Sequence, residues 1–302
     1  MNTTKMETPS FRLRYLVLIS LIASFPPGAS AQKTEADQKS EREAWKKYYV
    51  SCLPTYRFFI GKDKKPLKAI PEAKLRWDNP VREGRTHGEL FVWTNQGRGA
   101  VVGNILSYDV GENQRRVAHE FHSFDTEEII CERKEEPFKL SAPGVEYIPI
   151  PGAPIPAKSR GLRFAQMRRM AKDFKASTKK GDVAQPLRAL SAPLYRFETK
   201  KVEDDGAIFA YVTGTDPEIL VAIVAKKTDD GPAWFFGAGR FTDLQIDLKY
   251  KTKVVWKFQD WSSYEGGYHA RHGVDFQPHM PRVPEQAVGK DQGKAKKDEP
   301  AN

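Results

Sequence analysis

Apolar and polar positions alternate along two long stretches of the chain, a pattern that predicts β-strands. Turn-forming Gly, Pro, Asn and Asp residues separate the alternating segments. In the first stretch the predicted strands are 74–78, 88–95, 100–109, 115–124 and 127–133. In the second stretch they are 193–199, 206–214, 218–227, 233–242 and 244–258. Because the gaps between neighbours are short, we expect antiparallel sheets.

One strand in each stretch is apolar on both faces. Leu90 and Val92 alternate with Phe91 and Trp93, and the segment 206–214 has the same character. A strand of this kind is central in its sheet and covered on both sides. We expect one of the covers to be the helix that precedes each set of strands.

Helical spacing is found before both sets of strands. Apolar residues recur at three- and four-residue steps over 161–174, which predicts an amphipathic helix, and Ser159 is placed to cap it. The corresponding helix of the first stretch is predicted over about 36–51.

The two stretches resemble each other in sequence. Three segments of the first can be laid on three segments of the second, in the same order: 66–77 on 186–197, 88–93 on 206–211, and 117–124 on 234–241. The offset stays between about 117 and 120 residues, so only small gaps are needed. We interpret the match as an internal duplication; two copies are too few for a solenoid.

The predicted fold class is therefore α+β. We expect two tandem related units, residues 32–141 and 159–258, each a helix followed by a curled four- or five-stranded antiparallel sheet, a layout similar to that of cystatin and NTF2-like folds. A Pro-rich connector, 142–158, would join them and be pinned against them. Residues 259–282 form a predicted irregular segment rich in aromatics and His that could wrap the second unit, and 283–302 a predicted disordered charged tail.

The N-terminus has the pattern of a secretory signal. A basic start precedes an apolar run over 15–25, followed by Pro26-Pro27-Gly28 and the small-residue site Ala29-Ser30-Ala31. We expect cleavage after Ala31, which removes residues 1–31 and places the product in the periplasm or outside the cell. The alternative is an uncleaved anchor, but eleven apolar residues are too few to span a bilayer. After cleavage the protein would not be integral to the membrane.

The net charge of the chain gives only a weak indication of its binding partner. The chain has 49 Lys and Arg against 39 Asp and Glu, a net charge of +10. Removing the predicted signal removes three basic residues and one acid and leaves +8. The basic residues are dispersed among acids, so a solvated mixed surface is one interpretation and attraction to an anionic envelope polymer another. A small apolar ligand is also possible, whereas no nucleic acid and no cofactor are expected.

Cys52 and Cys131 both lie in the part predicted to be exported. In an oxidising compartment two thiols commonly pair, so a disulfide is predicted. The alternative is two separately buried thiols.

Candidate catalytic and metal-binding residues are weakly indicated, because no nucleophile motif or phosphate loop is present. If the protein is a hydrolase with an asymmetric site in the cleft between the units, the candidates are Glu120, His122, Asp125 and Arg240. If it is a metal carrier, the candidates are His269, His272 and His279. His119 and His122 are three apart in a predicted strand, so we expect them on opposite faces.

Aromatic residues on matching strands are the candidates for ligand binding. They could line an apolar cleft if one sheet face is uncovered, or they could form a plain aromatic core. These residues are Trp77, Phe91, Trp93, Phe197, Phe209 and Tyr211.

Three stretches carry a resemblance to a known family: Pro186–Phe197, Asp205–Glu218 and Trp234–Phe241. They are similar to an uncharacterised secreted protein family of planctomycete-type bacteria. The resemblance implies no known activity and transfers no functional residues. The favoured hypothesis is an exported, non-enzymatic binding or envelope-associated protein.

Overall fold

The computed structural model describes residues 35–79, 86–111, 114–133, 137–197, 199, 204–259 and 268–272. The chain divides into two units, residues 1–40 and residues 41–302, and the architecture below is that of the second. The predicted signal (1–31) and charged tail (283–302) lie outside the described residues. In the described part, neither helix is long and apolar enough to cross a membrane.

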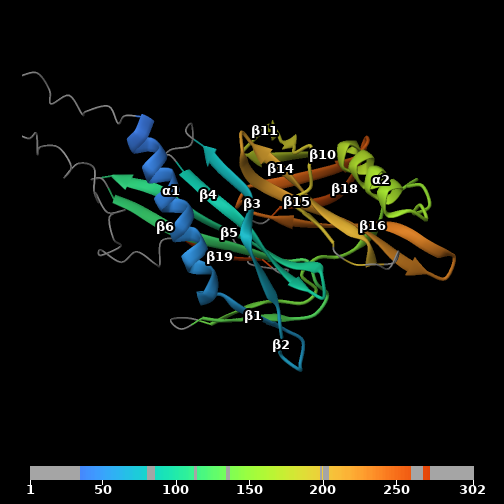
Figure 1. Cartoon of the computed structure of the whole chain (residues 1–302). Helices are drawn as coiled ribbons and strands as arrows, with labels where there is room; N and C mark the ends of the chain where they lie inside the picture. The colour runs from blue at the N-terminus through green and yellow to red at the C-terminus, as the bar shows by residue number, and fades with distance from the viewer. Residues whose placement is uncertain are drawn as a thin grey trace, which may run out of the picture. The chain divides into compact units, whose positions relative to one another are not determined.

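Two α-helices, a short 3-10 helix and a series of antiparallel strands form the described part of the chain, which has the predicted α+β content (Figure 1). The first half comprises α1 (Glu35–Cys52), the 3-10 helix η1 (Leu53–Thr55), β1 (Arg57–Ile60), β2 (Lys65–Pro66), β3 (Lys68–Asn79), β4 (Thr86–Asn95), β5 (Arg98–Gly111), β6 (Gln114–Ser123), β7 (Ile129–Glu132) and β8 (Phe138–Leu140). The second half comprises β9 (Ile148–Pro149), α2 (Arg160–Asp173), β10 (Phe174–Lys180), β11 (Val183–Pro186), β12 (Arg188–Ala189), β13 (Tyr195–Arg196), β14 (Gly206–Thr213), β15 (Asp216–Thr228), β16 (Gly231–Arg240), β17 (Gln245–Tyr250) and β18 (Lys253–Phe258). A last strand, β19 (Tyr268–His272), follows.

The strands form four sheets, named A to D here. Sheet A has the order β2-β1-β7-β8, and sheet D has the order β11-β10-β17-β18. Sheet B has the order β19-β6-β5-β4-β3. Sheet C has the order β12-β14-β15-β16-β9, with β13 also paired to β14. The strand order of sheet A thus recurs in sheet D, and the order β6-β5-β4-β3 of sheet B recurs as β16-β15-β14-β12 in sheet C. The outer strands β19 and β9 do not correspond, because β19 follows the second half and β9 precedes α2.

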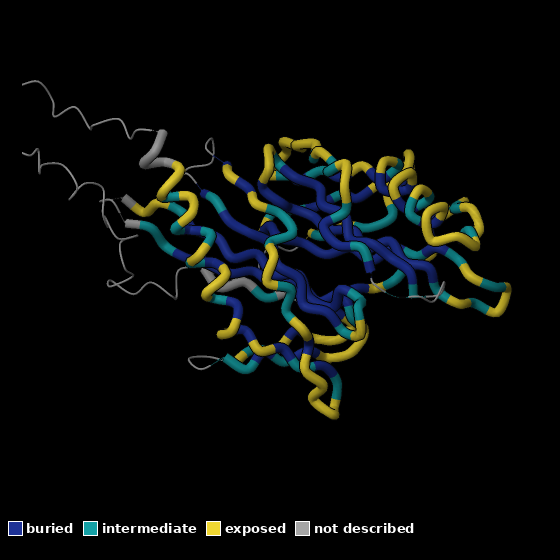
Figure 2. Tube along the Cα trace, viewed as in Figure 1, coloured by how far each residue is buried: buried dark blue, intermediate teal, exposed yellow. Residues whose placement is uncertain are grey.

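Three hydrophobic clusters separate these layers. Inward side chains of sheets B and C, among them Leu90, Val92 and Ile208, form the central cluster. The other face of sheet B is covered by α1 and sheet A, and the other face of sheet C by α2 and sheet D. The central strands are dark blue along most of their length in Figure 2, while loops and helix exteriors are exposed. β4 and β14 are therefore covered on both faces, as predicted.

Hydrogen-bond register also repeats between the halves. The amide of Phe124 donates to Ala100 at 2.7 Å, and that of Phe241 donates to Glu218 at 2.8 Å. Nearer the helices, the amide of Leu67 donates to Phe58 and that of Leu187 to Ala176. Each second contact lies 117 to 120 residues after the first, which is the offset found in the sequence.

A close contact between a glycine and an aromatic ring occurs in both halves. Trp77 lies opposite Gly88 in the β3–β4 register, and a Cβ on Gly88 would lie 2.9 Å from its ring. The Phe197 amide donates to Gly206, where a Cβ would lie 2.8 Å from the Phe197 ring. Only glycine leaves room for the ring at these two positions.

Several boundaries differ from the sequence prediction. The predicted strand 244–258 is two strands, because a turn at Lys251, with φ of 54°, reverses the chain between β17 and β18. Short strands such as β1 and β10 were missed because they directly follow the helical pattern. Part of the predicted irregular segment is β19, which pairs with β6 of sheet B instead of wrapping the second half.

Two local predictions are confirmed. Ser159 caps α2, since its hydroxyl accepts a hydrogen bond from the Leu162 amide at 3.2 Å. The Pro-rich connector is pinned, because β9 within it pairs with β16 and Ile150 is buried.

Candidate functional site

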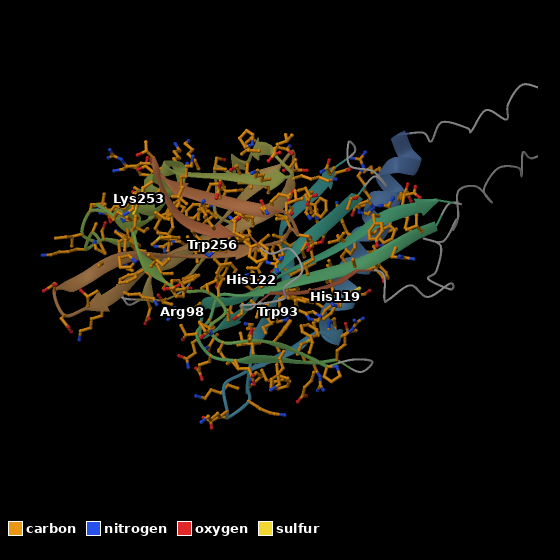
Figure 3. All side chains as sticks on the ribbon, turned by 180° about the vertical axis from the view of Figure 1, so that it is seen from behind. Trp93, Arg98, His119, His122, Lys253 and Trp256 are labelled. Carbon is orange, nitrogen blue, oxygen red and sulfur yellow. The ribbon has the colours of Figure 1, made fainter. Side chains whose placement is uncertain are left out.

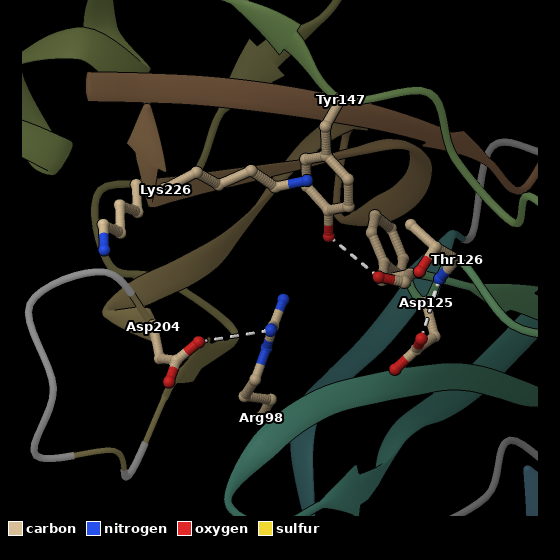
Figure 4. A pocket seen from close by; sticks show the side chains of 8 residues that line it. Arg98, Asp125, Thr126, Tyr147, Asp204 and Lys226 are labelled. Atoms are coloured by element: carbon tan, nitrogen blue, oxygen red, sulfur yellow. Dashed lines mark hydrogen bonds and ion pairs between the residues drawn. The ribbon is translucent and has the colours of Figure 1, made fainter. Parts of the chain in front are cut away.

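A polar pocket of about 300 Å³ lies where loops from both large sheets meet the connector (Figure 4). Arg98 comes from the start of β5, Asp204 from the segment before β14, Lys226 from β15 and Tyr147 from the connector. The complete lining is Arg98, Phe124, Asp125, Thr126, Tyr147, Asp204, Lys226 and Lys227. The pocket thus draws on both halves of the protein.

A tight turn between β4 and β5 places Arg98. Gln96 and Gly97 both have positive φ, 48° and 82°, which suits a two-residue hairpin connection. The Tyr195 hydroxyl donates to the Gly97 carbonyl at 3.0 Å and so holds this turn of the first half against the second half.

Tyr147 and Lys226 form the opposite wall. The Tyr147 hydroxyl donates to the Phe124 carbonyl at 2.8 Å. The Lys226 ammonium lies 3.8 Å from the centre of the Tyr147 ring, a cation–π contact, and points at the ring in Figure 4. Burial, and then the nearby charge of Arg98, lower the pKa of Lys226, which the charge of Asp125 partly offsets.

Both carboxylates of the pocket already have donors. Asp204 Oδ1 lies 3.4 Å from Arg98 Nη1. Asp125 Oδ1 accepts the backbone amides of Thr126 at 2.7 Å and Glu127 at 3.3 Å. Among the described residues, no carboxylate forms an ion pair with Lys226. The lining has three cationic side chains and two anionic ones, so the pocket favours an anionic guest.

The aromatic residues predicted to bind a ligand lie in the interior. All six are buried, with exposed fractions of 4% or less. Trp77 and Phe197 belong to the central cluster, Phe91 and Trp93 to the cluster under α1, and Phe209 and Tyr211 to the cluster under α2. The structure therefore distributes them over three cores and brings none of them to the pocket.

The four candidate catalytic residues do not share one surface. Asp125 lines the pocket, whereas Glu120, His122 and Arg240 are buried with exposed fractions of 6%, 5% and 2%. Arg240 donates to the Thr242 carbonyl at 3.1 Å and stacks on Phe258 at 3.9 Å. The hydrolase alternative remains a prediction.

Glu120 belongs to a buried polar chain between sheets B and C. Trp77 Nε1 donates to Asn104 Oδ1 at 3.0 Å, and Asn104 Nδ2 donates to Glu120 Oε2 at 2.9 Å. Burial raises the pKa of Glu120 to about 8, with smaller contributions from the charges of Asp216, Asp243 and Glu218. Burial lowers the pKa of His122 to about 4. At neutral pH, Glu120 and His122 thus carry less charge than the same side chains would in water.

Of the three histidines predicted to bind metal, two lie in the described residues, both on β19. His269 stacks on Phe138 with 3.9 Å between ring centres. His272 ends β19 and His279 lies outside the described residues. Within the described ranges, no group of three or more His, Cys, Asp or Glu residues could hold a metal ion. The metal-carrier alternative remains a prediction.

His119 and His122 lie on opposite faces of β6, as predicted (Figure 3). His119 Nδ1 lies 3.0 Å from the Tyr56 hydroxyl in the cluster under α1, whereas the His122 ring contacts Phe124 of the central cluster. The strand alternation therefore places their rings in different cores.

The structure holds Cys52 and Cys131 as thiols rather than as a disulfide. Both contact the hydrophobic cluster under α1. Burial raises the pKa of Cys131 to about 12, which disfavours a reactive thiolate. Cys131 is buried, whereas Cys52 is only partly buried.

Sequence reasoning missed Arg98, Tyr147, Asp204 and Lys226 as a group. Arg98 stands in a recognised turn signal and Tyr147 in the connector, but nothing in the sequence shows that these loops converge. Comparisons of the chain with protein-family models, with curated proteins and with solved structures find no match.

Proposed function

We propose that this protein is an exported, non-enzymatic binding protein that takes an anionic group into the pocket between its two halves. The single observation that carries the proposal is that Arg98 and Lys226 line the same pocket. Burying one cation next to another lowers the pKa of the lysine, and a bound anion would relieve that cost. The secretory pattern of residues 1–31 supports export.

The lining indicates the ligand class. Arg98 has a planar guanidinium that suits a carboxylate or phosphate, and Lys226 supplies a point charge. Tyr147 and Phe124 contribute the apolar part of the wall. A small apolar ligand fits poorly, because the other six lining residues are polar or charged. The expected ligand is a small molecule with a carboxylate or phosphate group.

We further propose that the two halves are tandem copies of one ancestral helix-and-sheet unit. The recurring strand order, the recurring register and the paired glycine–aromatic contacts support this. Duplication accounts for the asymmetry of the pocket, since Arg98 comes from a turn of the first copy and Lys226 from a strand of the second.

The test is calorimetric titration of the full chain with inorganic phosphate and with galacturonate. We expect at least one of them to bind, and Lys226→Met to weaken that binding about tenfold, because a hydrogen bond to a charged group contributes about 1.5–3 kcal/mol. Lys139→Met is the matched control: Lys139 is exposed on sheet A and lies outside the pocket lining.

Two outcomes would contradict the proposal. One is an absence of binding of either anion at millimolar concentration. The other is equal affinity of the wild type and Lys226→Met, with far-UV circular dichroism showing that both are folded.

A further inference from the structure

The outer face of sheet D is strongly cationic. Residues 174–186 and 245–258 contain seven lysines and two aspartates, a net charge of +5, with no arginine or glutamate. Inward positions of β10 and β17 are buried, and the alternate positions point to solvent. We call four outward lysines of β10, β17 and β18 the lysine face: Lys175, Lys179, Lys249 and Lys257.

Two of these lysines lie directly opposite each other. The β10–β17 register pairs Lys175 with Lys249, and both are exposed. Like charges in directly opposite positions destabilise a sheet. Among the described residues, no carboxylate forms an ion pair with either of them. The fold therefore keeps an unneutralised pair at a cost in stability.

The other two lysines each have a carboxylate partner, and one of these carboxylates, Asp247, lies on the face itself. Lys257 lies 3.5 Å from Asp247, and Lys179 lies 3.9 Å from Asp182 in the turn before β11. Lys251 and Lys253, at the turn between β17 and β18, add two further charges at one end; Lys253 is labelled in Figure 3. With four lysines against Asp247, the face carries a net positive charge.

The spacing of these charges suits a repeating anion. Residues four apart on a strand are about 13 Å apart, and neighbouring strands are about 4.8 Å apart. The lysine face therefore offers several cations over an extended area, and a small pocket of about 120 Å³ lies between Lys179, Asp247 and Lys257. Lysine is a flexible point charge that does not require a fixed geometry of its anion.

We propose that the lysine face is a docking surface for a linear acidic polysaccharide that bears repeated carboxylate or sulfate groups. The contact is multivalent and electrostatic, so its affinity falls as salt rises. This surface is independent of the pocket between the halves, which lies on other elements.

The experiment is retention of the full chain on immobilised polygalacturonate and heparin across a salt gradient. In the Lys175→Glu/Lys249→Glu variant we expect at least tenfold weaker binding at about 0.1 M salt and a shallower dependence on salt. This variant still has like charges in opposite positions, so cross-strand repulsion remains similar.

The matched control is Lys65→Glu/Lys139→Glu on sheet A, which changes the net charge by the same amount. We expect less than a twofold change for it. The milder Lys179→Gln/Lys257→Gln variant, expected to weaken binding about threefold, serves if the glutamates impair folding. In the calorimetric titration with inorganic phosphate and galacturonate, Lys175→Glu/Lys249→Glu should behave as the wild type does, because neither lysine lines the pocket, and this separates the proposal from the pocket.

Three results would overturn the proposal: an equal loss in the sheet A and sheet D variants, no retention of the wild type on either polymer, or binding confined to phosphatidylglycerol vesicles or to single-stranded DNA.

Discussion

Sheets A and D have the same strand order but opposite surface chemistry. In sheet A, Arg57 lies opposite Glu132, and their side chains form an ion pair at 3.2 Å. At the corresponding register of sheet D, Lys175 lies opposite Lys249. Inward positions are mostly apolar in both sheets because they fill a core, whereas outward positions are free to differ. The comparison teaches that the buried residues determine the strand order and register of a sheet, while the charges on its outer face can change without altering either.

The helices are anchored differently in the two halves. In the second half, Arg163 of α2 forms a buried ion pair with Asp205 at 2.6 Å, and Arg196 also pairs with Asp205. Asp205 directly precedes Gly206, and the residue that precedes the matching Gly88 in the first half is His87. The centres of the His87 ring and of the Trp45 ring of α1 are 5.1 Å apart. Charge thus anchors one helix, whereas the ring contact and the Tyr49 hydroxyl, which donates to the His87 carbonyl at 3.2 Å, anchor the other.

Breaking the charged anchor should have the largest effect on stability. Asp205→Ala leaves Arg163 buried without its carboxylate, which we expect to lower the free energy of unfolding by about 3–5 kcal/mol in urea denaturation. Asp204→Ala, next to it and partly exposed, is the control and should cost less than about 1 kcal/mol. Equal costs for the two would show that the buried pair is not the anchor.

The buried acid of the first half should make stability depend on pH. This acid is Glu120, which lies opposite Asn104 in sheet B. At the corresponding place in sheet C, Gly237 lies opposite Ala222, so the second half has no matching acid there. Because the folded-state pKa of Glu120 is raised to about 8, its contribution is fully present below about pH 4.5 and is lost as pH rises towards 8. Glu120→Gln should be more stable than the wild type at pH 8 by on the order of a few kcal/mol.

The same denaturation series at pH 4.5 is the control for this variant. There the two proteins should differ little, since Glu120 is protonated in the folded state and about half protonated in the unfolded state. A stability difference that does not change between pH 4.5 and pH 8 would contradict the assigned pKa direction.

Gly88 and Gly206 allow the backbone of sheet B to be compared with that of sheet C at matching positions. Gly88→Ala and Gly206→Ala should each cost about 1–3 kcal/mol, because the added methyl would press against Trp77 or Phe197. Gly161→Ala in the first turn of α2 meets nothing within 4 Å and should be neutral or slightly stabilising. Thermal unfolding measures all three; a cost at only one of the paired sites would weaken the case for a shared frame.

The smallest expected effect is that of the surface pair itself. Lys175→Glu creates an opposite-charge pair with Lys249 and should stabilise the protein by about 0.2–1 kcal/mol at low salt. The reverse change, Glu132→Lys in sheet A, should destabilise by a similar amount. Both effects should shrink in 0.5 M salt; if they persist unchanged, they do not arise from charge.

Much of the frame could be predicted from periodicity, and little of the site could. The alternation around Phe91 and the helical spacing before Phe174 mark positions that lie in the core. Such positions can be predicted because burial in the core requires apolar residues at the period of the strand or helix. The pocket depends instead on where Arg98 and Lys226, 128 residues apart, are brought together by turns, and local patterns do not encode that distance. The aromatic candidates were ambiguous because core and ligand sites use the same residue types.

The central claim is that the second half carries an anion-binding face that the first half lacks. Lysine acetylation, followed by mass spectrometry with and without polygalacturonate, tests it most directly. We predict slower modification of Lys175, Lys179, Lys249 and Lys257 when the polymer is present, and unchanged modification of Lys65 and Lys139 on sheet A. Equal protection of both groups, or protection of the sheet A lysines alone, would contradict the claim.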